Sequence, residues 1–180
     1  MINIGIIGKG FVGSAVANGF SSNTGFESKI RIYDKDPSRC LNSLDDTINK
    51  SDFIFLSLPT PSKKDGSISL KLLDDSLESI NQINRSSTNI LLLRSTVVPG
   101  TSKKFQDKYQ NLRIVFNPEF LTERSAFFDF INQSRIILGG KSEETNKVAM
   151  LYKERFGKHV PIIQTNYESA ELIKYMNNCF

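Results

Sequence analysis

The chain has 180 residues, of which 39% are hydrophobic and 23% are charged, and this is typical of a globular protein with one sizeable domain. No run of eighteen apolar residues occurs, so we expect no membrane-spanning helix. The net charge of +4 comes from scattered Lys and Arg residues without a basic stripe, so we expect no nucleic-acid binding. The two cysteines match no metal-ligand spacing, and we expect a metal-free, cytoplasmic protein.

Short apolar runs alternate with amphipathic stretches along the whole chain. The apolar runs predict strands at residues 3–8, 29–34, 52–59, 89–95, 112–116, 134–140 and 160–165. The stretches between them predict helices at residues 12–20, 43–51, 69–83, just after Gly100, 143–156 and 167–180, with Thr101 or Ser102 as the N-cap of the fourth. Strands that are apolar throughout are buried on both faces. The sequence therefore predicts an α/β fold with a doubly wound, mostly parallel, Rossmann-like sheet.

Glycines follow the first predicted strand in the pattern "GKGFVG", a G-x-G-x-x-G between a strand and a helix. Gly8 permits a tight turn, Gly10 lets a pyrophosphate approach the backbone, and Gly13 lets the helix pack closely on the strand. The helix N-terminus adds free N–H groups and a partial positive charge. These residues, with Phe11 and Val12 between the glycines, predict a dinucleotide-binding loop.

An acidic residue, Asp34, ends the second predicted strand and follows the glycines by about twenty residues, as dinucleotide-binding chains require. A carboxylate there accepts hydrogen bonds from ribose hydroxyls and repels a 2′-phosphate, so NAD is favoured over NADP. Arg39 lies close by in the sequence. Its side chain can either meet a 2′-phosphate or lie along the adenine edge, and NADP therefore stays open.

Polar residues also follow the third and fourth predicted strands. Pro59 and Thr60 begin a rigid loop, which we expect to line the cofactor, although a plain turn is the alternative. Ser95 and Thr96 end the fourth strand. Their hydroxyls can hold a water or a substrate oxygen at the sheet edge, or else bond to the local backbone.

The segment "NPEFLTERSAFFDF", after the fifth predicted strand, combines two carboxylates with four phenylalanines. Glu119 and Glu123 are four residues apart, so in a helical turn both face the same side. A carboxylate beside a nicotinamide can serve as a general base. The alternative is a solvated pair of glutamates over a phenylalanine-rich core.

The last predicted helix carries Lys174 and Asn178, again four residues apart, with Glu171 one turn before. A lysine and an amide on one helix face can stabilise a developing negative charge. On spacing alone, a solvated helix face is the simpler interpretation.

Together these motifs resemble the N-terminal, NAD-binding part of the UDP-glucose/GDP-mannose dehydrogenase family. The matching segments, in the family's order, are "IGIIGKGFVG", "YDKDPSR", "LPTP…DGS", "RSTVVPGT", "NPEFLTERSAFFDF…SRIILGG" and "SAELIKYMNN". Members of this family oxidise the C6 alcohol of a nucleotide sugar to a carboxylate with two NAD+. The resemblance implies NAD as the cofactor and, from the form "NPEFL", UDP-glucose as the substrate.

The resemblance also implies catalytic roles. Glu119 is expected to organise the site and its water, and Glu123 to act as general base in hydrolysis of a thioester intermediate. Thr96 is expected to position a catalytic water. Lys174 is expected to stabilise an oxyanion, with help from Asn178.

Binding roles are implied in the same way. The implied substrate contacts are Glu119, Phe120, Leu121, Glu123, Lys174 and Asn178. The implied cofactor contacts are Gly8, Gly10, Phe11, Val12, Gly13, Asp34, Arg39, Pro59, Thr60, Ser95 and Thr96.

Two features depart from the family's pattern. The segment "CLNSLDDTINK" is short where family members carry a long insert, and neither Cys40 nor Cys179 has the Gly-rich surroundings of the family's nucleophilic cysteine. We therefore expect residues 1–166 to form the NAD-binding domain and residues 167–180 the truncated start of a connecting helix, with the family's C-terminal domains absent. On this interpretation the chain alone is inactive, and a homodimer through the C-terminal helix belongs to a full-length form.

Two alternatives stay open on the sequence. The first is a small stand-alone NAD-dependent dehydrogenase or reductase that uses Lys174 as proton donor or base. The second is a non-catalytic NAD-binding module. Turnover of UDP-glucose by the chain alone separates the stand-alone enzyme from the other interpretations.

Overall fold

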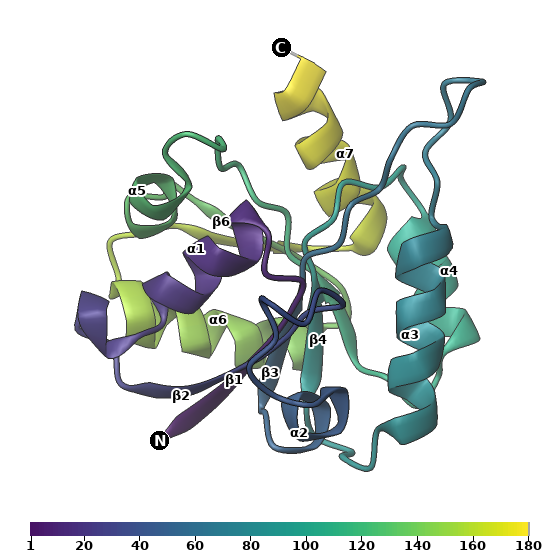
Figure 1. Ribbon diagram of the computed structural model, residues 1–180. Helices are drawn as coiled ribbons and strands as arrows, with labels where there is room; N and C mark the ends of the chain where they lie inside the picture. Colours follow the sequence, from purple (N-terminus) through teal and green to yellow (C-terminus); the bar gives the residue numbers. More distant parts are fainter. Residues whose placement is uncertain (180) are drawn as a thin grey trace.

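The computed structural model of the chain describes residues 1–179, and the side chains of residues 178 and 179 lie outside the described part (Figure 1). At its centre is a seven-stranded sheet in the order β2-β1-β3-β4-β5-β6-β7. Neighbouring strands are parallel except β5 and β6, which are antiparallel. The strands are β1 (Ile2–Ile7), β2 (Ser28–Tyr33), β3 (Phe53–Leu56), β4 (Ile90–Leu93), β5 (Ile114–Phe116), β6 (Ile136–Gly139) and β7 (Ile162–Thr165).

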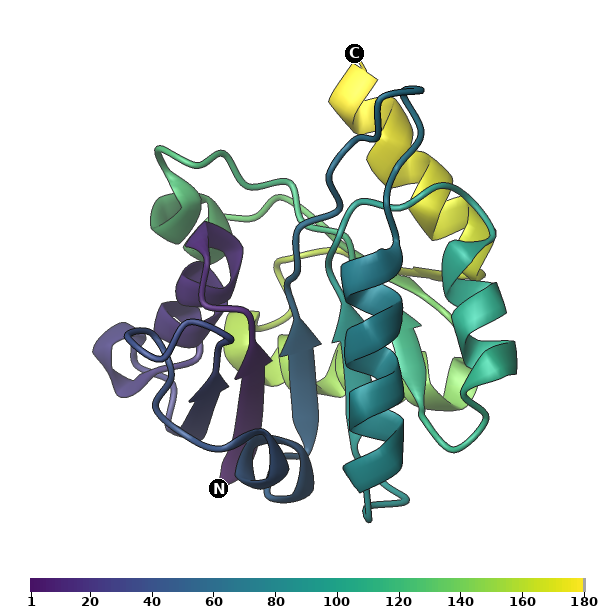
Figure 2. The same ribbon diagram turned by 45° about the vertical axis from the view of Figure 1, so that its right-hand side comes forward.

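Helices cover both faces of the sheet (Figures 1 and 2). They are α1 (Phe11–Gly19), α2 (Leu44–Asn49), α3 (Lys71–Ile83), α4 (Thr101–Lys108), α5 (Ala126–Ile131), α6 (Ser142–Phe156) and α7 (Tyr167–Cys179), with the 3-10 turn η1 (Ser22–Thr24). One hydrophobic core joins α1, α5 and α6 to one face. A second core joins α2, α3, α4 and α7 to the other face. The predicted doubly wound, mostly parallel, Rossmann-like sheet is therefore confirmed.

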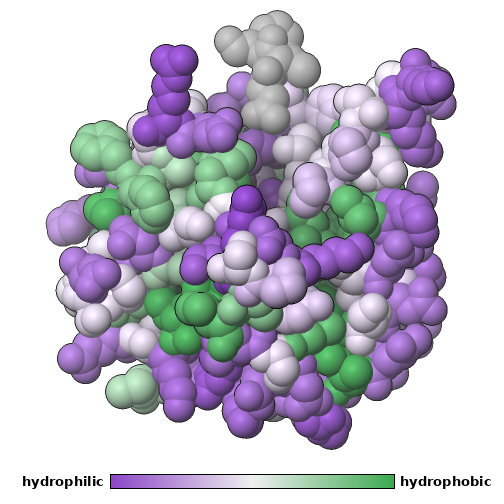
Figure 3. Space-filling view, viewed as in Figure 1, coloured by the Kyte–Doolittle hydropathy of each residue, from purple (hydrophilic) through white to green (hydrophobic). Residues whose placement is uncertain are grey.

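Helix α5 is not among the helices that the sequence predicted. Its Phe130 is fully buried against α1, where Gly19 makes room: a Cβ at Gly19 would lie 2.1 Å from the Phe130 ring. Phe127 and Phe128 are 51% and 69% exposed, and green atoms gather over α5 in the space-filling view (Figure 3). The phenylalanines of this segment therefore serve both the core and the surface.

The start of α4 also differs from the prediction, since neither Thr101 nor Ser102 is the N-cap. The N-cap is Gly100, whose φ of +90° lies in the left-handed region that favours glycine. Glu171 of α7 supplies the acceptors for the free N–H groups, and its carboxylate oxygens lie 2.6 Å from Gly100 N and 2.7 Å from Ser102 N. A side chain distant in the sequence therefore caps this helix.

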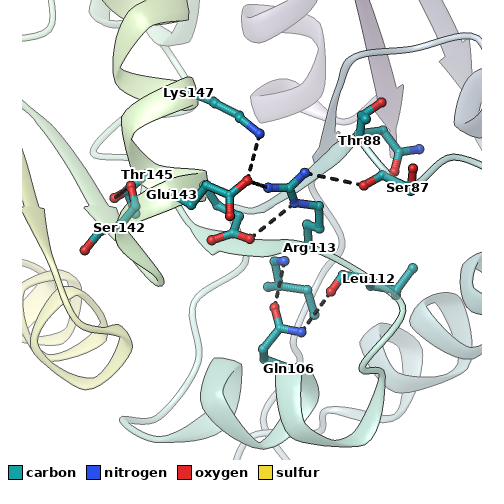
Figure 4. A network of polar contacts seen from close by, with 12 residues as sticks. Ser87, Thr88, Gln106, Leu112, Arg113, Ser142, Glu143, Thr145 and Lys147 are labelled. Atoms are coloured by element: carbon teal, nitrogen blue, oxygen red, sulfur yellow. Dashed lines mark hydrogen bonds and ion pairs between the residues drawn. The ribbon is translucent and has the colours of Figure 1, made fainter.

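A charged network fastens α6 to the start of β5, at the end of the sheet that we call the amino edge (Figure 4). Arg113 donates to the carboxylates of Glu143 and Glu144, with 3.2 Å between Arg113 Nε and Glu144 Oε1. Lys147 Nζ lies 3.0 Å from Glu143 Oε1. Both glutamates also lie in the first turn of α6, where the helix dipole favours negative charge. Positive and negative charges are thus matched at this edge.

Helix α7 packs against β5, β6 and α4 near its start and then extends past the sheet (Figures 1 and 2). From residue 1 to residue 179, no helix has the length and apolar character needed to cross a membrane. In the same part of the chain, no group of three or more His, Cys, Asp and Glu side chains is placed to hold a metal ion.

Candidate functional site

Apart from Lys174 and Asn178 of α7, the sequence-predicted residues follow the strands β1 to β5. They lie at the edge opposite the amino edge, which we call the carboxyl edge. Parallel strands end together, so their following loops gather at one edge of the sheet. Three segments matter here: the glycine loop (residues 8–13), the β4 loop (residues 94–100) and the β5 loop (residues 117–125). In both ribbon views these loops lie on the side toward which α7 extends (Figures 1 and 2).

The three glycines of the glycine loop have different surroundings. A Cβ at Gly8 would lie 2.3 Å from the backbone oxygen of Ser57, and a Cβ at Gly13 would lie 1.9 Å from the backbone oxygen of Gly8. In contrast, a Cβ at Gly10 would meet no atom within 4 Å. Gly8 and Gly13 are therefore required by packing, whereas Gly10 leaves open space at the N-terminus of α1. This space fits a pyrophosphate that approaches the backbone N–H groups of the helix.

Asp34 lies beside the glycine loop and is held by the backbone. Its Oδ2 accepts a hydrogen bond from Lys9 N at 2.6 Å, and its Oδ1 accepts one from Asp36 N at 2.8 Å. Arg39 is exposed and pairs with Asp36 at 3.4 Å, away from any contact with Asp34 among the described ion pairs. The carboxylate is thus fixed next to the loop, while the guanidinium is loosely placed.

Hydrogen bonds tie the loop after β3 to the β4 loop. The Ser95 hydroxyl donates to Leu58 O at 2.6 Å and accepts from Leu58 N at 3.2 Å. The Thr60 hydroxyl donates to Thr96 O at 2.8 Å. Ser95 and Thr60 therefore hold the two loops together, with Pro59 exposed beside them. The side chain of Thr96 is half-buried and makes no hydrogen bond to the described residues.

The two glutamates of the β5 loop do not share a helical face, because residues 117–122 form no helix. Glu119 is largely buried, accepts a hydrogen bond from Leu121 N at 2.7 Å and pairs with Lys174 Nζ at 3.0 Å. Glu123 lies in a turn, is exposed and has no hydrogen-bond partner among residues 1–177. The structure therefore separates the two carboxylates that the spacing had brought together.

Lys174 is 4% exposed and is directed from α7 to the β5 loop. Its ammonium donates to the backbone oxygen of Glu119 as well as to the carboxylate, and it lies 5.4 Å from the centre of the Phe120 ring. These contacts make Lys174 an internal partner of the loop and exclude a solvated helix face. The side chain of Asn178 lies outside the described residues, so the expected pair of Lys174 and Asn178 stays a prediction.

Glu171, for which the sequence suggested no role, is fully buried one turn before Lys174 on α7. Burial raises the pKa of the Glu171 carboxyl above its ordinary value, and the N–H groups of Gly100 and Ser102 partly oppose this effect. The two charged residues of α7 thus bind two different loops: Glu171 the β4 loop and Lys174 the β5 loop. In the sequence, the only sign of this role is that Glu171 lies on the same helix as Lys174, one turn before it.

Comparison with known proteins agrees with this arrangement. The model of the "UDP-glucose/GDP-mannose dehydrogenase family, NAD binding domain" matches residues 39–156. An uncharacterized protein of Methanocaldococcus jannaschii is 33% identical and covers 99% of this chain, which spans 24% of that protein. The UDP-glucose 6-dehydrogenase AglM of Haloferax volcanii is 28% identical, with 99% of this chain and 51% of that protein covered.

Among solved structures, a GDP-mannose dehydrogenase from Pseudomonas aeruginosa superposes with a TM-score of 0.80 and 26% identity. The match covers 98% of this chain and 49% of that one, so the chain spans about half of that enzyme. The family model describes an NAD binding domain, and its match begins at residue 39, after the glycine loop and Asp34. The chain therefore belongs to the UDP-glucose/GDP-mannose dehydrogenase family and carries its NAD-binding domain.

Proposed function

We propose that the chain is the cofactor-binding portion of a nucleotide-sugar 6-dehydrogenase that oxidises the C6 alcohol of UDP-glucose to the carboxylate of UDP-glucuronate in the cytoplasm. The observation that carries this proposal is the glycine loop, with open space at Gly10 and the Asp34 carboxylate bonded to Lys9 N. Similarity to a UDP-glucose 6-dehydrogenase over 99% of the chain supports the choice of sugar nucleotide. Bound NAD would supply the acceptor for hydride.

The residues of the chain have distinct tasks in this proposal. The N–H groups at the start of α1 bind the pyrophosphate, and Asp34 binds the ribose hydroxyls and selects against a 2′-phosphate. Thr96, whose side chain is not engaged by the described residues, holds a water or a substrate oxygen at the carboxyl edge. Thr60 and Ser95 shape the adjoining wall, because their hydroxyls donate to backbone oxygens. Pro59 lies exposed beside them.

The ion pair of Glu119 and Lys174 holds the substrate-binding segment in place. The backbone and side chains of Phe120 and Leu121 contact the sugar nucleotide, and Lys174 and Asn178 stabilise negative charge on the substrate oxygen. The exposed Glu123 acts as general base when substrate and the remaining part of the protein enclose it. Oxidation of an alcohol to a carboxylate removes four electrons, so it requires two NAD+ in succession.

The relatives are longer than this chain, which spans 24% to 51% of the first proteins matched. We propose that complete oxidation, tight binding of the sugar nucleotide and homodimer formation need the part of the relatives that the chain does not span. Lys174 is engaged in an ion pair with Glu119, which supports a role in stabilising negative charge over that of a free base in a stand-alone reductase.

Calorimetric titration of the chain with NAD+, NADP+ and UDP-glucose tests the proposal. We expect NAD+ to bind more tightly than NADP+, with weak binding of UDP-glucose and no turnover. The Gly10→Ala variant is the sharpest probe, because a Cβ there meets no protein atom within 4 Å. It should unfold at the same temperature as the unmodified chain and yet bind NAD+ at least about tenfold more weakly, since the methyl occupies the space of the pyrophosphate.

The Asp34→Asn variant is the matched probe for cofactor choice. It keeps an oxygen acceptor for Lys9 N but removes the charge that repels a 2′-phosphate. We expect the preference for NAD+ over NADP+ to fall. If the unmodified chain and the Gly10→Ala variant bind NAD+ with equal affinity, the proposed cofactor site is wrong. If the chain alone turns over UDP-glucose, oxidation does not need the part of the relatives that the chain does not span.

A further inference from the structure

A cavity of about 200 Å³ lies between the β5 loop and the segment that joins α5 to β6. It is lined by Arg94, Arg135 and residues 119–121, 128, 129 and 132–134. Sites for drug-sized ligands usually exceed about 300 Å³, so this cavity fits a small ion or one group of a larger ligand. No residue of the glycine loop lines it.

Arg94 brings a buried positive charge to this cavity. The residue is 3% exposed, and Nη1 donates to Asn117 Oδ1 at 2.7 Å and to the Tyr152 hydroxyl at 3.3 Å. Both partners are neutral, and burial raises the pKa of Tyr152 above its ordinary value. Within the described part of the chain, Arg94 Nε has no hydrogen-bond acceptor and no carboxylate lies within ion-pair distance. The Arg94 guanidinium therefore lacks a hydrogen-bond acceptor for Nε and a negatively charged partner.

Arg135 brings a second positive charge. Its guanidinium lies 4.8 Å from the centre of the Phe120 ring, and Nη2 donates to Asn177 Oδ1 at 2.8 Å. Asn177 is also neutral. Among the ion pairs of residues 1–177, none includes Arg135. The ring and the amide therefore fix the direction of the guanidinium without neutralising it.

The two carboxylates that line the cavity are already engaged elsewhere. Glu119 is paired with Lys174. Asp129 Oδ2 accepts hydrogen bonds from Thr122 N at 2.9 Å and from the Ser125 hydroxyl at 2.8 Å, and these bonds lower the pKa of Asp129. The cavity is thus left with two guanidinium groups that form no ion pair with any carboxylate of residues 1–177.

We propose that this cavity is a binding site for a small oxyanion, such as a phosphate group, held between Arg94 and Arg135. A buried charge without a partner is costly, and an oxyanion supplies both the charge and the acceptors that Arg94 lacks. Guanidinium groups bind phosphate and carboxylate groups through parallel hydrogen bonds. The phosphate is either free in solution or part of a nucleotide. The cavity shares no residue with the glycine loop, so it does not depend on NAD binding, but residues 119–121 also belong to the proposed sugar-nucleotide site, and the inference rests on that part of the proposed function.

Titration of the ¹⁵N-labelled chain with sodium phosphate, at ionic strength held constant with NaCl, tests the proposal by NMR. We expect phosphate to shift the Nε–H signals of Arg94 and Arg135 and the amide signals of residues 119–121. The Arg135→Gln variant should weaken these phosphate shifts at least about tenfold, because it removes one charged donor pair. Arg124→Gln is the matched control: it removes an exposed arginine of the same loop and should leave the phosphate affinity unchanged.

Two further experiments, competition with UDP and the Arg94→Lys variant, identify the source of the phosphate and provide a variant that stays folded. UDP that displaces phosphate from the two arginines assigns the site to a nucleotide, and UDP without effect assigns it to free phosphate. Arg94→Lys keeps the charge but loses the paired donors, so it should also weaken binding while the chain stays folded. The proposal is overturned if phosphate shifts only the signals of the glycine loop, or if Arg135→Gln binds phosphate as well as the unmodified chain does.

Discussion

Two arginines at opposite ends of the sheet have contrasting surroundings. Arg113, at the amino edge, meets the carboxylates of Glu143 and Glu144 (Figure 4). Arg94, at the carboxyl edge, is more deeply buried but meets only the neutral groups of Asn117 and Tyr152. The same residue type is neutralised where the sheet is fastened to a helix and left positive where ligands of such sheets bind. Charges are therefore less completely paired at the carboxyl edge. The buried ion pair that residues 1–177 form there, Lys174 with Glu119, belongs to the candidate site.

The largest loss of stability is expected for Lys174→Met. The change leaves the Glu119 carboxylate largely buried without its charge partner, and breaking a buried pair costs about 3 kcal/mol. Urea unfolding measures the loss, with the exposed Lys104→Met as the matched control. The double variant Lys174→Met/Glu119→Gln should regain part of it. An unchanged free energy of unfolding would show that solvent reaches the pair.

Arg113→Met should have the next largest effect. It leaves Glu144, which is 7% exposed, beside an apolar side chain, and we expect a loss of about 2 kcal/mol because Arg113 is itself only partly buried. Urea unfolding of this variant and of Arg124→Met separates the effect of position from the loss of a charge. If Arg113→Met and Arg124→Met lower the free energy of unfolding equally, the carboxylates at the amino edge do not depend on Arg113, and the contrast between the two edges is wrong.

A smaller, pH-dependent effect is expected for Glu171→Gln. Because burial raises the pKa of Glu171 in the folded state, its contribution to stability is full below the ordinary value of 4.5 and is lost as the pH rises through the folded pKa. Glutamine does not titrate, so the stability of the variant relative to the unmodified chain should increase with pH. Urea unfolding between about pH 4 and 8 measures this, with the exposed Glu168→Gln as control. A constant difference across that range would contradict the raised pKa.

The smallest effect should come from Arg94→Met, although Arg94 is the more buried of the two arginines. Methionine removes an uncompensated charge, and Tyr152 still donates to Asn117 Oδ1 at 2.5 Å. We expect the free energy of unfolding to stay within about 1 kcal/mol of the unmodified value, or to rise. A loss of more than about 2 kcal/mol in urea unfolding would mean that the guanidinium is a structural group.

The sequence predicted those strands and helices whose local residue pattern is sufficient to determine them. The runs "NIGII" and "ILLL" are apolar and bounded by turn residues, so strands were predicted at β1 and β4 within a few residues. Helix α5 was missed because its phenylalanines follow no helical pattern: Phe130 is buried, but Phe127 and Phe128 are exposed. The predicted N-cap of α4 was wrong, because the N–H groups at the start of this helix donate to Glu171 of α7, which is distant in the sequence.

The candidate site was predictable only to the level of its motifs. A dinucleotide loop could be predicted from Gly8, Gly10 and Gly13, because the need for glycine at these positions comes from the local backbone. The separation of Glu119 from Glu123 depends on the contact of Glu119 with Lys174, which lies far along the chain. Arg94 gave one signal, a charge directly after the apolar run "ILLL", but the neutrality of its partners is a property of the folded chain.

Helix α7 holds two loops at points only three residues apart, through Glu171 and Lys174. A helix is stiff along its axis, so a small tilt of α7 moves both attachments together. The positions of the β4 loop, which carries Thr96, and of the β5 loop, which carries Glu119, are therefore coupled through α7.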